Sequence, residues 1–323
     1  MSFRALFPII WLATACSFMP AHAQRAKSSA SATLPLNPYQ APWISAPQSD
    51  STAMQWFLRT FRQKSKPRKA FVSVATTGKT QLLVNGMNVS RNLFEPYRAY
   101  GDTSVVNIAY DITPFIGKNN TLSLWYCPTM PHVGRRQVAV CYWGEYADGT
   151  PFAFNSNEKW VCRRANRGLL PPQSEWHNAT DKAIPWHINH TDTIAWQQVA
   201  TFNHNLCPPT PQLLRTISAP RMAKVYPPSQ KEVGGDTLTC TFPHHFQGFV
   251  RVTFRGTRSG ENIYINNYCY ISNGTTDEQA FLKFSVLNIH KVIIHGDKHF
   301  RVEHVQNVEA IEVNFGLYEK FPF

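Results

Sequence analysis

The fold class is indicated most directly by the stretch Thr80-Gln81-Leu82-Leu83-Val84-Asn85-Gly86-Met87-Asn88-Val89. Two runs of β-prone residues flank the Asn85-Gly86 pair, which tolerates the positive φ angles of a two-residue type I′ turn. This stretch therefore predicts a β-hairpin.

Further strands are predicted around the hairpin, at 70–75, 105–110, 121–126 and 137–143. In the last part of this region, Leu122, Leu124 and Tyr126 alternate with their neighbours, which is the period-2 pattern of a half-buried strand. Turn residues separate the strands at short intervals, as they do in a β-sandwich or jelly roll.

The second half of the chain is also predicted to be β-rich, with strands at 237–242, 249–255, 261–270, 279–286, 291–294, 300–304 and 310–316. Between the halves, Pro171-Pro172, Pro185 and Pro208-Pro209 interrupt residues 166–211, which are predicted to be a loop. The predicted fold class is all-β, with two β-sandwich, jelly-roll-like domains in tandem after a signal peptide. We place these domains at residues 42–220 and 225–323.

The N-terminus has the pattern of an export signal. Arg4 precedes a mostly apolar run, and Ala21-His22-Ala23 has the small-x-small form of a signal-peptidase site. Residues 1–23 are therefore predicted to be a signal peptide and residues 24–41 a flexible leader, with lipoprotein processing at Cys16 as the alternative. No later apolar stretch has the length of a membrane span, so we expect an exported protein that is not transmembrane. Its expected location is the periplasm, the extracellular space or the cell surface.

The charge and the cysteines restrict the partners and the redox chemistry. The formal net charge is +12, but the basic residues do not form one block with interleaved aromatic residues, so no nucleic-acid partner is expected. Seven cysteines less Cys16 leave six, an even number that permits disulfides in an exported protein. Cys127 and Cys141 flank a short connection and are the expected pair.

A sustained order of short motifs resembles a known family. The order runs through Val84-Asn85-Gly86, Glu95-Pro96-Tyr97 and Leu124-Trp125-Tyr126, and it resembles the N-terminal β-domain of bacterial α-L-rhamnosidases. Parts of it are shared with galactose-binding-like sandwiches of glycosidases. Downstream, Ala147-Asp148-Gly149-Thr150 resembles the same domain, and Phe246-Gln247-Gly248-Phe249-Val250-Arg251 resembles the β-domain that follows it. The resemblance covers residues 42–323 and implies a sugar-binding fold.

Catalytic chemistry is not indicated by the sequence. Glycoside hydrolysis normally requires two carboxyl groups that face each other across the sugar, whereas Glu95, Glu145 and Asp148 are isolated acids in predicted loops or strand ends. In the family that the chain resembles, the catalytic carboxylates lie in a helical (α/α) barrel after the β-domains, and this chain ends at Phe323 before such a barrel. We therefore expect no catalytic residue and no cofactor.

Histidines are frequent toward the C-terminus, at His244, His245, His290, His295, His299 and His304. Imidazoles at strand ends can converge on a metal ion, but no Asp or Cys stands at ligand spacing from them. No metal site is expected.

A ligand pocket is expected at the loops that hold Asn88, Arg91, Glu95, Tyr97 and Trp125. These side chains would supply hydrogen bonds and one aromatic face for stacking on a sugar ring. Further tryptophans lie in or next to the irregular region, at Trp160, Trp176, Trp186 and Trp196. Packing is the favoured role for each of them, and sugar stacking is the alternative.

The leading interpretation is an exported, non-catalytic carbohydrate-binding protein that resembles the β-domains of α-L-rhamnosidases. Its expected partner is a carbohydrate, in particular a rhamnose-containing polysaccharide. One alternative is a truncated or split α-L-rhamnosidase, a glycoside hydrolase that works with a separate catalytic chain. Another is a protein-interaction module at the cell surface, because one fold can serve many functions.

Overall fold

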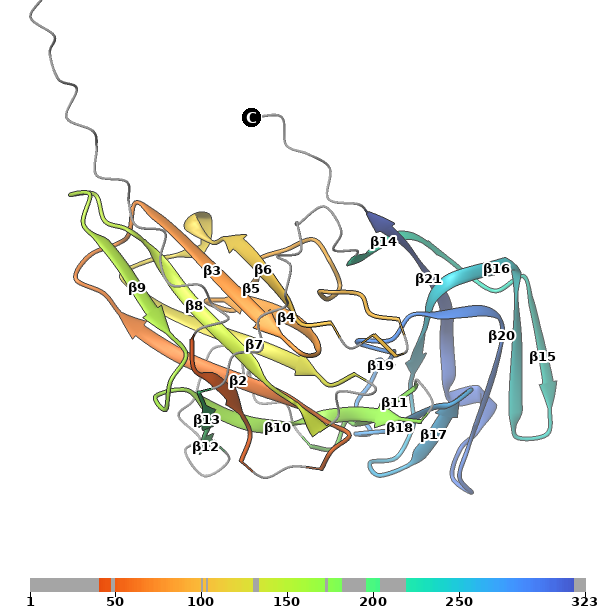
Figure 1. Ribbon diagram of the computed structural model, residues 1–323. Helices are drawn as coiled ribbons and strands as arrows, with labels where there is room; N and C mark the ends of the chain where they lie inside the picture. The colour runs from red at the N-terminus through yellow and green to blue at the C-terminus, as the bar shows by residue number, and fades with distance from the viewer. Residues whose placement is uncertain are drawn as a thin grey trace, which may run out of the picture. The chain divides into compact units, whose positions relative to one another are not determined.

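The hairpin predicted at Asn85-Gly86 is present in the computed structural model, which describes residues 41–47, 50–99, 101–102, 104–129, 134–171, 174–181, 196–203 and 219–316 (Figure 1). The two turn residues have φ angles of 51° and 82°. They connect β4 (Lys79–Val84) to the short strand β5 (Met87–Asn88). Asn85 Nδ2 also donates a hydrogen bond of 2.8 Å to the carbonyl oxygen of Phe115, which fixes the hairpin turn against the 3₁₀ turn at Thr113–Phe115. The predicted signal peptide and residues 24–40 of the predicted leader lie outside the described residues, whereas Ala41, the last leader residue, is buried.

The first half of the chain contains a smaller sheet with the strand order β13-β1-β8-β3-β6, and β9 also pairs with β8. Its strands are β1 (Trp43–Ser45), β3 (Lys69–Thr76), β6 (Val106–Asp111), β8 (Val138–Glu145), β9 (Pro151–Asn155) and β13 (Ala200–Phe202). A single 3₁₀ turn, η2 (Thr113–Phe115), follows β6.

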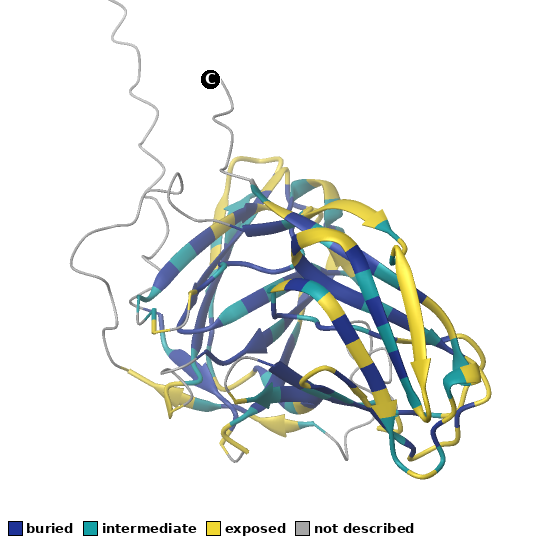
Figure 2. Ribbon diagram, turned by 90° about the vertical axis from the view of Figure 1, so that its right-hand side faces the viewer, coloured by how far each residue is buried: buried dark blue, intermediate teal, exposed yellow. Residues whose placement is uncertain are grey.

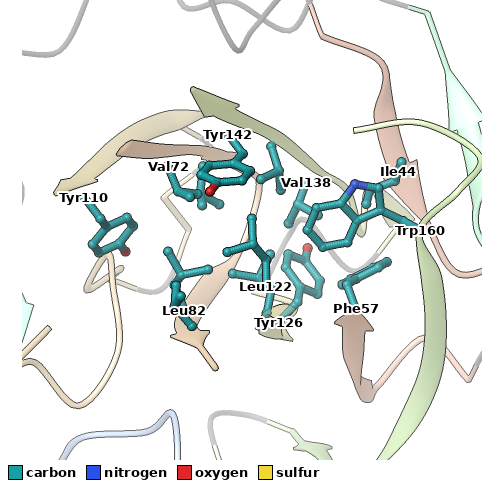
Figure 3. Packing of buried hydrophobic residues seen from close by; sticks show 14 of the residues in the cluster. Ile44, Phe57, Val72, Leu82, Tyr110, Leu122, Tyr126, Val138, Tyr142 and Trp160 are labelled. Atoms are coloured by element: carbon teal, nitrogen blue, oxygen red, sulfur yellow. The ribbon is translucent and has the colours of Figure 1, made fainter. Parts of the chain in front are cut away.

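A larger sheet packs against the smaller one to form the first sandwich. The strands that it contributes here are β2 (Ala53–Arg62), β4, β5, β7 (Asn119–Cys127), β10 (Val161–Leu170) and β12 (Gln197–Gln198). Figure 3 shows Val72 and Tyr142 of the smaller sheet directed toward Leu122 and Tyr126 of the larger one, and all four are buried. Burial of a side chain of this size contributes about 1.5–3 kcal/mol to the stability of the fold. The alternation predicted for β7 directs every second side chain of that strand into this core.

The second half of the chain surrounds its own hydrophobic core. Its strands are β14 (Ala219–Tyr226), β15 (Gln230–Gly234), β16 (Thr237–Phe254), β17 (Asn262–Ile265), β18 (Tyr268–Ile271), β19 (Glu278–Ala280), β20 (Leu287–Gly296) and β21 (Val305–Gly316). The long strand β16 pairs with β15, β19, β20 and β21 and is irregular at two places. Figure 2 shows how buried and exposed positions alternate along these strands.

Hydrogen bonding continues from the first half into the second. β11 (Ser174–Asn178) pairs with β10 on one side and, in the parallel direction, with β18 on the other. The larger sheet therefore runs without interruption through both halves, and all described residues belong to one compact unit. The prediction of an all-β, sandwich-type fold is confirmed. The domain boundaries at residues 220 and 225 stay a prediction.

Three strand predictions and one loop prediction are corrected by the structure. The run 261–270 is two strands, because Asn266 adopts a φ of 50° and turns the chain between β17 and β18. The run 279–286 keeps only the β19 segment, and 300–304 contains the 3₁₀ turn η5 (Val302–His304). Residues 166–211 are not all loop, because β10, β11, β12 and β13 reach into this region on either side of Pro171-Pro172.

The expected disulfide between Cys127 and Cys141 is wrong, since both cysteines are free and buried. Cys127 lies on β7 and pairs with Lys79 of the larger sheet, whereas Cys141 lies on β8 and pairs with Ser73 of the smaller sheet. The short connection between them therefore crosses from one sheet to the other. Within the ranges that the structure describes, no helix has the length and apolar character to span a membrane.

Candidate functional site

The loop after the Asn85-Gly86 hairpin presents two of the predicted ligand-binding residues to solvent. Asn88 ends β5 and is exposed, and its Oδ1 accepts a hydrogen bond of 3.4 Å from the backbone N–H of Ser90. Arg91 is also exposed. Both side chains are available to a ligand at the surface.

Glu95 is placed differently, because it is 1% exposed. Its backbone N–H donates to the carbonyl oxygen of Thr80 at 2.8 Å, and Thr80 N–H donates back at 2.6 Å, so the loop is bound to β4 as an isolated bridge. Asn92 Nδ2 donates to Glu95 Oε1, while Oε2 has no hydrogen-bond partner among the described residues. The Glu95 carboxylate is therefore buried beneath its own loop and is not accessible to solvent.

Tyr97 and Trp125 are half-buried and pack against one hydrophobic cluster, which includes Trp56, Phe94 and Phe284. The ring centroid of Trp125 lies 5.7 Å from that of Phe284 and 5.8 Å from that of Trp56. The structure thus brings two of the five predicted residues, Tyr97 and Trp125, to one cluster. Glu95 is buried nearby, whereas Asn88 and Arg91 are exposed. Their role in ligand binding stays a prediction.

Charged side chains of the first half bind the backbone of residues 281–284 in the second half. Both carboxylate oxygens of Glu175, a fully buried side chain, accept backbone N–H groups, from Lys283 at 2.8 Å and from Phe284 at 2.7 Å. Lys79 Nζ donates to the carbonyl oxygen of Phe284 at 2.8 Å, and Arg167 donates to that of Phe281 at 2.6 Å.

Burial shifts the pKa values of the two lysines in this region. It lowers the pKa of Lys79, and it lowers the pKa of Lys283 to about 8, with Arg167 acting in the same direction and Glu175 opposing it. Lys283 Nζ lies 5.2 Å from the ring centroid of Trp125. The face of Trp125 toward this region is therefore occupied by the protein itself.

A row of side chains crosses four neighbouring strands of the larger sheet, on the face that points away from the protein interior. Trp176 of β11 is paired with Cys269 of β18, Cys269 with Tyr264 of β17, and Tyr264 with His295 of β20. Paired residues lie on the same face of a sheet. Except for Gly296, the residues that flank them in sequence are buried and so lie on the inward face. We call Trp176, Cys269, Tyr264 and His295 the outer row.

The outer row is accessible to solvent. Tyr264 is 37% exposed, His295 is exposed, and Trp176 and Cys269 are half-buried. Neighbouring strands lie about 4.8 Å apart, which puts the backbones of Trp176 and Tyr264 about 10 Å apart with the small Cys269 side chain between them. Burial raises the pKa of the Cys269 thiol, so this residue is a neutral, small element of the row.

The rings at the two ends of the outer row have defined neighbours. Tyr264 stacks on His295 with ring centroids 5.2 Å apart and 22° between the ring planes. Trp176 lies against Gly168, where an added Cβ would come within 2.5 Å of the indole Nε1, and the Arg164 guanidinium carbon lies 5.1 Å from the ring centroid. These contacts hold both rings in place before any ligand arrives.

Amide side chains flank the outer row. Two residues away from the outer row on the same strands, Asn178 of β11 is paired with Ile271 of β18, and Ile271 is paired with Asn262 of β17. All three residues are half-buried. Amides donate and accept hydrogen bonds. Asn178 Oδ1 already accepts hydrogen bonds from the backbone N–H and the hydroxyl of Thr180, and Asn262 Nδ2 donates to Asp297 Oδ2 at 3.4 Å. Among the described residues, the Nδ2 group of Asn178 and the Oδ1 atom of Asn262 are left for the hydroxyl groups of a ligand that stacks on the rings.

The tryptophans of the irregular region separate into different roles. Trp160 is 1% exposed and belongs to the first core, and Trp196 packs on the cluster around Phe284, so packing is confirmed for these two. Trp186 lies outside the described residues. Trp176 faces outward, as the stacking alternative requires. Tyr264 was not among the predicted site residues, although its place between Ile263 and Ile265 is typical of an outward position in an alternating strand.

The fold of this chain is similar to that of part of several α-L-rhamnosidases of known structure. The enzyme from Dictyoglumus thermophilum matches with a TM-score of 0.72 and 17% identity over 85% of this chain. The enzyme from Streptomyces avermitilis, solved with L-rhamnose, matches with a TM-score of 0.68 and 17% identity over 82% of this chain. The Aspergillus terreus enzyme matches with a TM-score of 0.66 and 13% identity over 86%.

The likeness is one of fold, and it concerns part of each enzyme. The matches cover 36%, 29% and 36% of those chains, so this chain spans about a third of their length. No protein-family model and no curated protein sequence matches the chain. The predicted resemblance to the β-domains of α-L-rhamnosidases is confirmed at the level of the fold.

Proposed function

We propose that this chain is an exported carbohydrate-binding protein with no catalytic activity of its own. The observation that carries the proposal is the match of 85% of the chain to an α-L-rhamnosidase structure with a TM-score of 0.72. The matched β-domains belong to enzymes that act on a sugar, and one of them was solved with L-rhamnose. A rhamnose-containing glycan is therefore the first ligand class to test.

The outer row is the site that we assign to this ligand. The apolar face of a pyranose packs on an aromatic ring, and the hydroxyl groups at its edge need hydrogen-bonding partners. Tyr264 and Trp176 supply the rings, and Asn178 and Asn262 supply the amides. The distance of about 10 Å between the two aromatic positions suits a ligand of at least two sugar units.

Calorimetric titration of the purified chain with rhamnose-containing oligosaccharides, pectic fragments and galactosides tests the function. Binding of one of these classes is expected, and a flat response across them and across a broad glycan array contradicts the proposal. Hydrolysis of an aryl rhamnoside by the chain alone would contradict the non-catalytic part.

Three variants test the assignment of the site. Tyr264→Ala removes one stacking ring and is expected to lower affinity about tenfold, the equivalent of about 1.4 kcal/mol. Phe202→Ala is the matched control, because Phe202 is an aromatic side chain of similar exposure, 38%, on β13 of the smaller sheet. Arg91→Ala tests the loop site predicted from the sequence. If Arg91→Ala reduces affinity and Tyr264→Ala does not, the ligand binds at the loop.

A second candidate function is that of an accessory chain of a split α-L-rhamnosidase. The observation that favours it is the coverage of only 36% of the enzyme chain that this chain matches. An adjacent reading frame that encodes a helical barrel, together with rhamnosidase activity that appears only when both chains are mixed, would select this function.

A further inference from the structure

His245 and His290 form a cross-strand pair on the surface of the second half. β16 and β20 are antiparallel, and Phe246 is paired with Ile289. Next to this pair, the rings of His245 and His290 have centroids 4.5 Å apart and 28° between their planes. Strand pairing thus brings together two imidazoles whose positions in the sequence show no ligand spacing.

Both imidazoles lie on the outward side of the sheet. Phe246 and Ile289 are 3% and 6% exposed and belong to the second core. Successive side chains of a strand point to opposite faces, which turns His245 and His290 outward. His245 is exposed and His290 is half-buried, so solvent reaches the pair.

The fold does not use the nitrogens of these rings. Within the residues that the structure describes, His245 and His290 contact each other but make no hydrogen bond or ion pair. The neighbouring His244 differs, because its Nε2 lies 3.2 Å from the Tyr226 hydroxyl oxygen and 3.7 Å from a carboxylate oxygen of Glu312. The nitrogens of the cross-strand pair remain available to an external ligand.

We propose that His245 and His290 bind a divalent transition-metal ion as a bidentate site, with Cu²⁺ preferred over Ni²⁺ and Zn²⁺. Imidazole nitrogen suits all three ions, and affinity for a given set of nitrogen ligands peaks at Cu²⁺. An ion about 2.0–2.1 Å from each nitrogen requires the two nitrogens to be about 3 Å apart. The two rings are stacked with centroids 4.5 Å apart, so both side chains must rotate to turn a nitrogen edge toward a common ion.

The site is an open chelate. Across the described ranges, no group of three or more His, Cys, Asp or Glu side chains is placed to hold a metal ion. Water therefore completes the coordination, and the exposed amides of Gln247 and Asn288, which form the next outward pair of the same two strands, stand beside it. Such a site binds reversibly and does not resemble the closed sites that hold a fold together. The proposal does not depend on carbohydrate binding.

The test uses the full chain without an affinity tag, titrated with Cu²⁺ by calorimetry, with Ni²⁺ and Zn²⁺ for comparison. His245→Asn and His290→Asn are each expected to lower the affinity for the first Cu²⁺ equivalent by at least about tenfold. The double variant is expected to lose no more than either single variant, because one imidazole alone gives no chelate. His295→Asn, a second exposed histidine of β20, is the matched control and is expected to stay within about twofold.

Electron paramagnetic resonance of the Cu²⁺ adduct gives a readout that needs no variant, because two coordinated imidazole nitrogens are expected in the native chain. A spectrum with one nitrogen ligand or none overturns the proposal. A His290→Asn chain that binds Cu²⁺ as tightly as the native chain also overturns it, as does an equal loss of affinity in His295→Asn.

Discussion

Protonation of His177 is expected to destabilise the junction between β11 and β18. The ring is buried, its Nε2 lies 3.3 Å from Asn166 Nδ2, and its Nδ1 lies 3.3 Å from the Tyr268 hydroxyl oxygen. Because an amide nitrogen can only donate, Nε2 accepts and Nδ1–H donates to Tyr268, which defines a neutral imidazole. Burial, supported by the nearby Arg167 guanidinium, lowers the pKa of His177 to about 2.

The sign and the size of the effect follow from this pKa. Between about pH 6.5 and pH 2 the unfolded chain takes up a proton at His177 and the folded chain does not, so the free energy of unfolding falls as the pH falls. Each pH unit below about 6.5 costs about 1.4 kcal/mol, which gives about 2 kcal/mol at pH 5. The contribution of His177 is fully present above about pH 6.5.

Urea unfolding at about pH 7 and pH 5, followed by tryptophan fluorescence, measures this loss. His177→Gln keeps a polar side chain and removes the titration, so the loss of about 2 kcal/mol between the two pH values should disappear from its stability. His295→Gln, which alters an exposed histidine, should keep the native pH response. An equal pH-dependent loss in the native chain and in His177→Gln would refute the reasoning.

Three further predictions concern stability and are read by urea unfolding. Gly248→Ala places a Cβ 2.0 Å from the carbonyl oxygen of Ile311 and should lower the free energy of unfolding by about 1–3 kcal/mol. Gly234→Ala is the control, because nothing lies within 4 Å of its added Cβ, and its free energy of unfolding should change by no more than about 0.5 kcal/mol. Equal effects of the two substitutions would contradict the close approach at Gly248. Glu175→Gln leaves one of the backbone N–H groups of Lys283 and Phe284 facing an amide donor and should lower the free energy of unfolding by about 1–3 kcal/mol. An unchanged urea midpoint would contradict a stabilising role for these two hydrogen bonds. Burial raises the pKa of the Cys162 thiol to about 12, so stability should fall by about 2 kcal/mol from pH 8.5 to pH 10 as the unfolded thiol ionises, and Cys162→Ala should remove that part of the loss.

Local patterns predicted the first sandwich well, because its strands alternate and its hairpin has the Asn-Gly pair that a tight turn favours. They failed where the outcome depends on distant partners. The turn at Asn266 has no glycine to signal it, and β11 is a strand because it lies between β10 and β18. Residues 281–286 are apolar like a strand but pack and bind through their backbone to Glu175 and Lys79.

The candidate sites show the same limit. Aromatic content and loop position pointed to Tyr97 and Trp125, which the structure packs against other side chains. Tyr264 and Trp176 share a face only because β17 and β11 both pair with β18. The His245–His290 contact likewise follows from the pairing of β16 with β20, which no spacing rule in a single sequence can supply.

The parallel pairing of β11 with β18 limits how this chain can be divided. A cut between residues 220 and 225 would leave residues 176–178 in one fragment and their partners 269–271 in the other. Each fragment would then carry an unprotected strand edge, which is a template for association with other chains. Fusion, domain exchange and truncation should therefore treat the region from β1 to β21 as one indivisible module.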